Sequence, residues 1–445
     1  MRERSLTSAA SAAVLEADLT WTGSRFESGV RISVDRTGRI EAVGALDAVP
    51  TRRLPRRALV PGLVDAHSHA FQIGLRGRSE RFAAGAGSFW TWRDAMYELA
   101  GSLDRGGFRD LCARAFGEMR DSGITAVGEF HYLHHATEER DGSFDAVVLE
   151  AAEEAGIRLV LLQSYYETGG IGRPLAPAQR RFAVGSVTEY WERFDRLAER
   201  LDPATQSLGV APHSIRAANL DDLAALHAEA RRRGLPVHMH VEEQRGEIEE
   251  CMAAYGEPPM ALLQRSLSSL EAVTAVHCTH TTYEDLEAFV EAGGSICVCP
   301  LTEANLGDGI PDLAGMARRA GRLCIGSDSN LRIAMVEEMR WLEYGQRLRR
   351  EERGVLADEE GRVGRSLLTA ATRGGAAALG LAAGAITPGS WADLTALDLD
   401  APELEGCDED GLLDAWVFGA GDRAVAATCV GGRWRDTGDG AIVER

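Results

Sequence analysis

Short apolar segments alternate with longer segments of helical periodicity along most of this chain, and this alternation constrains the fold more than any other feature. A chain that alternates strands with amphipathic helices is typical of β/α units around a parallel sheet. Helical patterns such as those at 220–233 and 283–292 separate the apolar runs. The apolar runs predict eight strands, near residues 59–67, 124–132, 158–166, 207–213, 236–242, 273–278, 294–299 and 323–328. Eight such units predict an α/β fold, the (β/α)8 TIM barrel.

The two ends of the chain have a different pattern. Residues 12–58 and 386–435 contain short alternating segments with turn signals, which are typical of antiparallel strands. Because these regions flank the barrel region on both sides, we expect one small β-sandwich-like domain built from residues 1–58 and 382–445. The barrel would then occupy residues 59–381 and carry the catalytic site.

Charge and residue usage exclude several functions. The 445 residues include 48 basic and 68 acidic ones, a net charge of −20, which disfavours nucleic acid and anionic membranes as partners. The chain contains no lysine, so a P-loop lysine, a Schiff-base lysine and a carbamylated lysine bridging two metals are all excluded. The eight cysteines form no CxxC pair, and the N-terminal segment lacks the apolar core of a signal peptide. We therefore expect a cytoplasmic protein with reduced thiols.

Histidines gather near the ends of the predicted strands, where TIM barrels place their chemistry. His67 and His69 end the first strand, and alternate residues of a strand share one face. His240 belongs to the fifth strand and Asp328 to the eighth. An HxH pair alone is a weak signal, but three imidazoles and a carboxylate that face one cavity suit Zn²⁺ with a position left for water. We expect one ion per chain, zinc or another divalent metal.

Several longer motifs make the chain recognisable. The pattern of HxH, H, H and D at these strand ends resembles the amidohydrolase superfamily and, within it, the N-formimino-L-glutamate deiminases of histidine degradation. The tail from ATRGGAAALGL to GSWADLTALD resembles the closing segment of that superfamily. The other stretches that carry the resemblance are HSHAFQ, SFWTWRD, GEFHYLHH, APHSIRA, HMHVEEQ, VHCTH, GSDS and VEEMRWLEYGQRLR.

The resemblance implies a role for each matching position. The metal ligands would be His67, His69, His240 and Asp328, and the catalytic acid/base residues would be Glu243, His277 and Asp328. The substrate would be bound by Gln72, Arg93, Tyr132, His213 and Arg216. One position departs from the family, which usually has histidine two residues after the metal aspartate, whereas this chain has Asn330. We expect catalysis to survive this change, because an amide can still donate a hydrogen bond there, and the exact substrate preference stays open.

The implied reaction hydrolyses N-formimino-L-glutamate, a small anionic substrate, to N-formyl-L-glutamate and ammonia. Zinc would lower the pKa of a water to about 7, Asp328 with help from His277 would accept its proton, and Glu243 would transfer protons to the imino nitrogen. For most arginines the ordinary role is a surface ion pair. The motif matches instead favour Arg93 and Arg216 as forked donors to the substrate carboxylates.

Two alternatives stay open beside this prediction. One is another zinc aminohydrolase, acting on a guanidino acid, formimino-aspartate or a nucleobase. The other is a non-catalytic protein with an amidohydrolase-like barrel, which the filled ligand positions disfavour. By analogy with related barrels, we expect a homodimer. We expect His131, His134, His135 and His280 to serve in structural hydrogen bonds.

Overall fold

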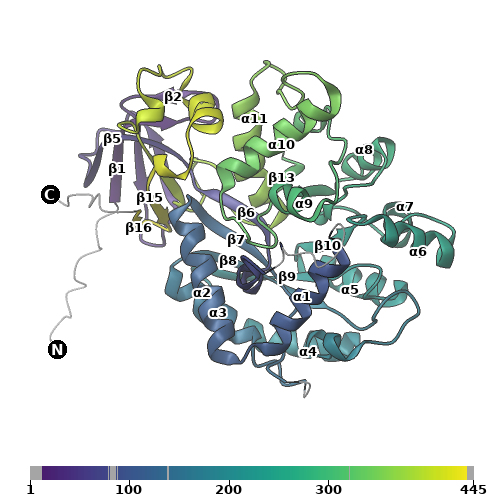
Figure 1. Cartoon of the computed structure of the whole chain (residues 1–445). Helices are drawn as coiled ribbons and strands as arrows, with labels where there is room; N and C mark the ends of the chain where they lie inside the picture. The colour runs from purple at the N-terminus through teal and green to yellow at the C-terminus, as the bar shows by residue number, and fades with distance from the viewer. Residues whose placement is uncertain are drawn as a thin grey trace, which may run out of the picture.

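The computed structural model describes residues 13–78, 80, 87, 89–137, 140–319 and 321–437. It contains two sheets of eight strands each, one forming a barrel and the other a separate domain at its side (Figure 1). Among the described residues no helix is long and apolar enough to span a bilayer.

The barrel sheet consists of parallel strands in strict sequence order, from β6 to β13. A parallel bridge between Ser68 and Asp328 brings the first and last strands together. The prediction of an eight-stranded barrel is thus confirmed. The strands are β6 (Leu63–Ser68), β7 (Ile124–His131), β8 (Arg158–Tyr165), β9 (Gln206–Pro212), β10 (Val237–Val241), β11 (Val273–His277), β12 (Ser295–Val298) and β13 (Leu323–Ile325).

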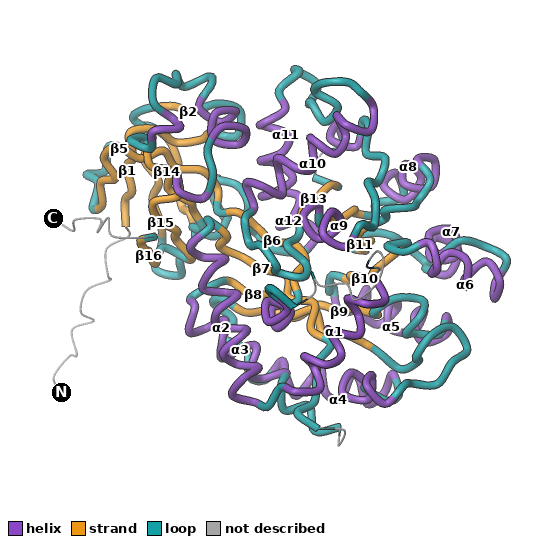
Figure 2. The backbone as a smooth tube through the Cα atoms, in the orientation of Figure 1, coloured by secondary structure: helices purple, strands orange, loops and turns teal. Residues whose placement is uncertain are grey.

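Helices cover the outside of these strands (Figure 2). Every residue of β7 and β8 is buried, as expected for parallel strands packed on both faces. Helix α5 has the predicted bounds, because Asn219 caps its first turn and Gly234 in the left-handed region ends it. The helices are α1 (Phe89–Ser102), α2 (Arg105–Asp121), α3 (Asp145–Ala155), α4 (Val187–Ala198), α5 (Leu220–Arg233), α6 (Arg245–Tyr255), α7 (Pro259–Ser266), α8 (Tyr283–Glu291), α9 (Pro300–Leu306), α10 (Met335–Arg350), α11 (Val363–Thr369) and α12 (Gly375–Ala378).

The first predicted strand, 59–67, is in fact divided between the two sheets. Its beginning belongs to β5 (Arg52–Pro61) of the side domain, and its end belongs to β6. Gly62 separates the two, and a Cβ at this position would lie 2.1 Å from Thr125 Oγ1. Glycine is therefore needed where the chain crosses from one sheet to the other. A continuous apolar run gives no sign of such a break.

The second sheet joins strands from both ends of the chain, as the sequence predicted (Figure 1). Strand β5 pairs in parallel with β1 and antiparallel with β14, so segments far apart in the sequence share one core. Leu15, Ile32, Leu54 and Leu394 belong to that core. The strands are β1 (Ala13–Trp21), β2 (Phe26–Glu27), β3 (Arg31–Val34), β4 (Ile40–Gly44), β5, β14 (Leu394–Asp398), β15 (Val425–Val430) and β16 (Arg433–Asp436).

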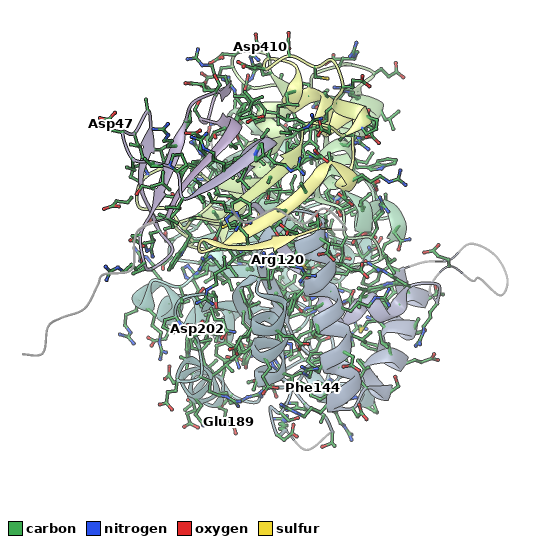
Figure 3. The ribbon with its side chains drawn as sticks, turned by 90° about the vertical axis from the view of Figure 1, so that its left-hand side faces the viewer. Asp47, Arg120, Phe144, Glu189, Asp202 and Asp410 are labelled. Atoms are coloured by element: carbon green, nitrogen blue, oxygen red, sulfur yellow. The ribbon has the colours of Figure 1, made fainter. Side chains whose placement is uncertain are left out.

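Buried arginines join the side domain to the barrel. Figure 3 shows Arg120 of α2 at the boundary between the C-terminal strands and the barrel helices. Its Nε donates to Thr428 Oγ1 at 3.0 Å. Arg158 of β8 donates from Nε to Asp393 Oδ2 at 2.6 Å, and Gly431 donates its N–H to the other oxygen of the same carboxylate. The hydrogen bonds of Arg120 and the ion pair between Arg158 and Asp393 fix the barrel against the sheet. They lie at the end of the barrel away from the site described next.

Candidate active site

The predicted metal ligands meet at the carboxyl ends of the barrel strands. His69 Nε2 lies 3.3 Å from His240 Nε2 and 3.4 Å from Asp328 Oδ1, and His67 Nε2 lies 3.5 Å from the same oxygen. His67 and His69 extend from β6, His240 from β10, and Asp328 follows β13. Two overlapping sets of ligand atoms have the spacing of a metal site: His67 with His69 and Asp328, and His67 with His240 and His277. We call the four predicted ligands, His67, His69, His240 and Asp328, the cavity cluster.

Hydrogen bonds behind the imidazoles leave their inner nitrogens free. His69 Nδ1 contacts Phe130 O at 2.7 Å and His240 Nδ1 contacts His213 O at 2.9 Å, which fixes both rings with Nε2 directed inward. Neither ring nitrogen of His67 has a hydrogen-bond partner among the described residues, although the side chain is fully buried. Buried nitrogens without partners are costly, and a cation among them would satisfy them. The residues therefore fit a divalent metal.

The charges of the cavity cluster also suit a metal. Burial lowers the pKa of His67 to about 3 and lowers the pKa of His69, so both imidazoles are neutral ligands at neutral pH. Burial alone would raise the pKa of Asp328, but the adjacent imidazole of His67 and the charge of His277 outweigh it and lower that pKa. Asp328 also holds φ at 49°, an unusual conformation for a residue with a side chain. Its N–H donates to His67 O at 2.9 Å, which fixes the carboxylate beside the histidines.

Only one histidine of the HMH motif faces the cluster. His238 is two residues before His240, but its Nε2 contacts Ala378 O at 2.9 Å. The resemblance implied His240 as the ligand, and the structure places His240 beside His69.

The predicted catalytic pair lies beside the cavity cluster. His277 Nε2 is 3.9 Å from Asp328 Oδ2, and His277 Nδ1 is 3.3 Å from Glu303 Oε1. Burial opposes a charge on His277, but the carboxylates of Glu243 and Glu303 outweigh it and raise its pKa to about 10. Burial raises the pKa of the Glu243 carboxyl, and His277 and Arg216 limit the rise. Sequence reasoning missed Glu303, because only folding brings α9 against the end of β11.

A cavity of about 360 Å³ opens above the cluster. All the predicted site residues except His67 line it, and of its aromatic side chains the sequence had predicted Tyr132. Gln72 donates from Nε2 to Tyr132 OH at 2.7 Å. The aromatic residues of the lining are Phe89, Trp90, Trp92, Tyr97, Tyr132, Tyr166 and Phe182.

Two predicted substrate arginines enter the cavity from different elements. Arg93 of α1 stacks its guanidinium on Trp90, 4.3 Å from the ring centroid. Arg216, after β9, places Nη2 3.9 Å from Glu243 Oε2 and Nε 3.8 Å from Glu247 Oε1. Both side chains contact the cavity, so cationic donors lie near the cavity cluster.

Asn330 lies behind the cluster instead of in the cavity. Its Nδ2 donates to Ser68 Oγ and to Asp328 O, both at 3.0 Å, and its Oδ1 accepts from Ser327 Oγ at 2.8 Å. The residue is fully buried and is not among the lining residues. The amide donates hydrogen bonds from this position, and its contacts support the backbone around Asp328.

A second group of buried histidine and aspartate side chains could also hold a metal ion by its spacing. Asp145 Oδ1 is 3.0 Å from His131 Nε2 and 2.8 Å from His134 Nδ1, and Asp145 Oδ2 accepts from Arg193 Nη2 at 2.9 Å. His134 Nε2 contacts Ser164 O at 2.9 Å. We call His131, His134, Asp145 and Arg193 the closed cluster. The structural role predicted for these two histidines agrees with these hydrogen bonds.

Comparison with known proteins agrees with the predicted resemblance. Residues 58–435 match the profile of the Amidohydrolase family. The chain belongs to the amidohydrolase family. A formimidoylglutamate deiminase from Pseudomonas aeruginosa is 40% identical over 383 residues, which cover 85% of this amidohydrolase and 84% of the relative. The predicted resemblance to that group of deiminases is thus confirmed.

Solved amidohydrolase structures share the whole architecture. A crystal structure of an amidohydrolase from Brucella melitensis has a TM-score of 0.84 at 34% identity and covers 95% of this chain and 94% of its own. An adenosine deaminase from Xanthomonas campestris, crystallised with bound zinc, has a TM-score of 0.79 at 26% identity over 95% and 92% of the two chains. The chain is accordingly a hydrolase with a metal-binding group of histidines and an aspartate.

Proposed function

We propose that this amidohydrolase hydrolyses N-formimino-L-glutamate to N-formyl-L-glutamate and ammonia. The observation that carries the proposal is the position of Arg216, whose guanidinium lies in the cavity beside Glu243 and the cavity cluster. A substrate with a carboxylate close to its reacting carbon suits such a site, because guanidinium binds carboxylates through paired hydrogen bonds. The 40% identical relative carries the same activity in its name.

We propose Zn²⁺ as the metal, held by His67, His69, His240 and Asp328. Three imidazole nitrogens and one carboxylate oxygen are donors that suit zinc, and a structural neighbour contains it. When bound, such a cation polarises the reacting carbon and acidifies water to give a nucleophile at neutral pH.

The residues around the cavity cluster supply the proton transfers. Asp328 accepts the proton of the attacking water, and His277, whose Nε2 lies 3.9 Å from Asp328 Oδ2, assists it. Glu243 lines the same cavity as His277 and delivers protons to the imino nitrogen, so that ammonia leaves. Glu303 holds His277 Nδ1 and keeps Nε2 directed at the reacting groups.

The polar lining orients the small anionic substrate. Arg216 and Arg93 bind its two carboxylates, and Gln72, Tyr132 and His213 complete the polar surface. Arg93 keeps its orientation because it stacks on Trp90. An anionic substrate in a protein of net charge −20 depends on these local cations for binding.

The test is ammonia release from a panel of amidines by metal-loaded protein. The panel contains N-formimino-L-glutamate, N-formimino-L-aspartate, guanidino acids and guanine, and we expect the first to give the highest kcat/KM. A higher value for any other compound would overturn the proposed substrate. Metal analysis of the same protein separates an enzyme from a scaffold, because a scaffold would neither contain nor bind a stoichiometric divalent ion.

A nucleobase is the second candidate substrate, and the aromatic lining favours it. Trp90, Tyr97, Tyr166 and Phe182 contribute aromatic surface to the cavity, against which a purine would pack. The two arginines argue against a neutral ring, which offers no carboxylate. Guanine in the panel decides between the two candidates.

A further inference from the structure

Arg216 lies between two buried carboxylates, those of Glu243 and Glu247. Its Nη2 is 3.9 Å from Glu243 Oε2, and its Nε is 3.8 Å from Glu247 Oε1. Arg216 and Glu243 line the cavity, whereas Glu247 contacts the arginine from outside the lining. The guanidinium therefore has one carboxylate beside the cavity and another behind it.

Glu247 is unusual for an acidic residue in the first turn of a helix. It is the third residue of α6, where glutamate commonly caps the helix N-terminus or extends into solvent. Here its side chain is 0% exposed, and neither of its oxygens has a hydrogen-bond partner among the described residues. A buried carboxylate without partners is costly, and the cation it faces is Arg216. Burial raises the pKa of the Glu247 carboxyl to about 7, and the charge of Arg216 limits the rise, so the contact with this arginine favours the ionised form.

The Nε atom of Arg216 is in the same situation. It is buried and has no hydrogen-bond partner in the described part of the chain. The 3.8 Å separation from Glu247 is too long for a hydrogen bond but is within the range of an ion pair. Without Glu247, the guanidinium would have Glu243 as its remaining carboxylate neighbour and would move toward it. Such a pair would occupy both the donors for the substrate and the carboxylate needed for proton transfer.

We propose that Glu247 is a positioning residue for substrate binding. Its carboxylate holds the Nε side of Arg216, so that the terminal nitrogens face the cavity and bind a substrate carboxylate instead of collapsing onto Glu243. This inference rests on the proposed function, since it takes Arg216 as the carboxylate-binding group. It adds a specificity determinant that does not itself touch the substrate.

The test is a double-mutant cycle on Glu247 and Arg216, with glutarate as the probe and calorimetric Kd as the measurement. Glu247→Gln keeps the shape of the side chain and removes the charge. We expect it to weaken glutarate binding by roughly 10- to 100-fold, the range for a hydrogen bond or ion pair to a charged group. In the Arg216→Met background the same change should have no further effect on Kd. A role confined to folding would give additive losses.

Glu338→Gln is the matched control, because Glu338 is equally buried and its Oε1 also lacks a partner among the described residues, while its Oε2 accepts from Leu301 N. We expect this variant to bind glutarate as the wild type does. Wild-type affinity in Glu247→Gln, additive losses in the cycle, or no glutarate binding by the wild type would each overturn the inference. Ammonia release from N-formimino-L-glutamate is measured separately. Coupling in the cycle without ammonia release would overturn the proposed function and leave the role of Glu247 standing.

With N-formimino-L-glutamate as substrate, the inference also predicts how the kinetic constants separate. Glu247→Gln should raise KM by a larger factor than it lowers kcat, because the metal ligands and His277 are untouched. An equal fall of kcat at unchanged KM would contradict a role in positioning Arg216.

Discussion

The cavity cluster and the closed cluster contain the same kinds of side chain, but their chemistry is opposite. Both combine buried histidines with one aspartate, and both have the ligand-atom spacing of a metal site. In the closed cluster, Asp145 accepts from two imidazoles, from Arg193 and from Gln163, and the second nitrogen of His134 contacts Ser164 O. The carboxylate is thus hydrogen-bonded to both imidazoles and to an internal cation, although Arg193 Nη1 has no partner among the described residues.

The cavity cluster lacks such internal hydrogen bonds. His67 has no hydrogen-bond partner for either nitrogen among the described residues, and the Nε2 atoms of His69 and His240 face each other at 3.3 Å. The difference teaches that residue type and proximity do not distinguish a metal site from a hydrogen-bonded core. Imidazole nitrogens without hydrogen-bond partners do so.

The sharpest way to break the comparison is to exchange ligands within one motif. We expect His240→Gln to lose the bound metal and to lower kcat/KM by about 10⁴-fold or more, as for removal of a group essential to catalysis. His238→Gln, two residues away, should keep one metal per chain, because His238 Nε2 is committed to Ala378 O. Metal content by mass spectrometry and ammonia release measure both. Retention of metal by His240→Gln would refute the ligand assignment.

A smaller loss of activity is expected for Glu243, which transfers protons beside the cavity cluster and does not bind the metal. Glu243→Gln should retain the metal while kcat falls by about 10²- to 10⁴-fold, the usual contribution of a general acid–base. Glu242→Gln is the neighbouring control, since Glu242 Oε1 accepts from Met260 N instead of lining the cavity. Turnover near the wild-type rate in Glu243→Gln would remove that residue from the mechanism.

Arg216 beside the cavity cluster and Arg193 in the closed cluster should respond differently to the same substitution. Arg216→Met should raise KM for N-formimino-L-glutamate by about 100-fold with the metal still bound, since truncating one member of a buried charge pair costs 2–5 kcal/mol. Arg193→Met should leave KM unchanged and lower Tm, because Arg193 contacts Asp145 and not the cavity. Steady-state kinetics and thermal unfolding of both variants provide the measurement, and an unchanged KM in Arg216→Met would eliminate the carboxylate role.

Loss of the central carboxylate tests whether the closed cluster is purely structural. Asp145→Asn removes the charge that balances Arg193, so we expect the free energy of unfolding to fall by about 3 kcal/mol, as for a broken buried ion pair. Metal content and KM should match the wild type. A drop in metal stoichiometry would mean that the closed cluster also holds an ion.

The smallest expected effect is on the pH dependence of stability. Burial lowers the pKa of His134 to about 3 in the folded protein, against about 6.5 in an unfolded chain. Between these values the unfolded chain binds the proton and the fold does not, so His134 makes stability fall as the pH drops below about 6.5. In metal-free protein, Tm of His134→Gln should therefore decline less than that of the wild type between about pH 7 and pH 5. Parallel curves would contradict this. In the cavity cluster, the same acidification should appear as release of the metal.

The sequence by itself determined the architecture and the membership of the site. The alternation of apolar runs with helical patterns depends on local periodicity, so the barrel strands and helix α5 could be located from it. His67 and His69 could be paired because a strand repeats every two residues. His240 and Asp328 followed from strand order, since the carboxyl ends of a barrel's strands meet on one face.

Only the tertiary structure decided which buried polar groups remain uncommitted. His131 is the last residue of β7, and His67 is the second-last residue of β6. Helix α3 brings Asp145 against His131, and this contact joins residues of two different elements. The break at Gly62, the support of Asp328 by Asn330 and the pairing of Arg216 with Glu247 have the same origin. A side chain's partner in a core depends on which elements pack against its own, and local periodicity carries no record of that packing.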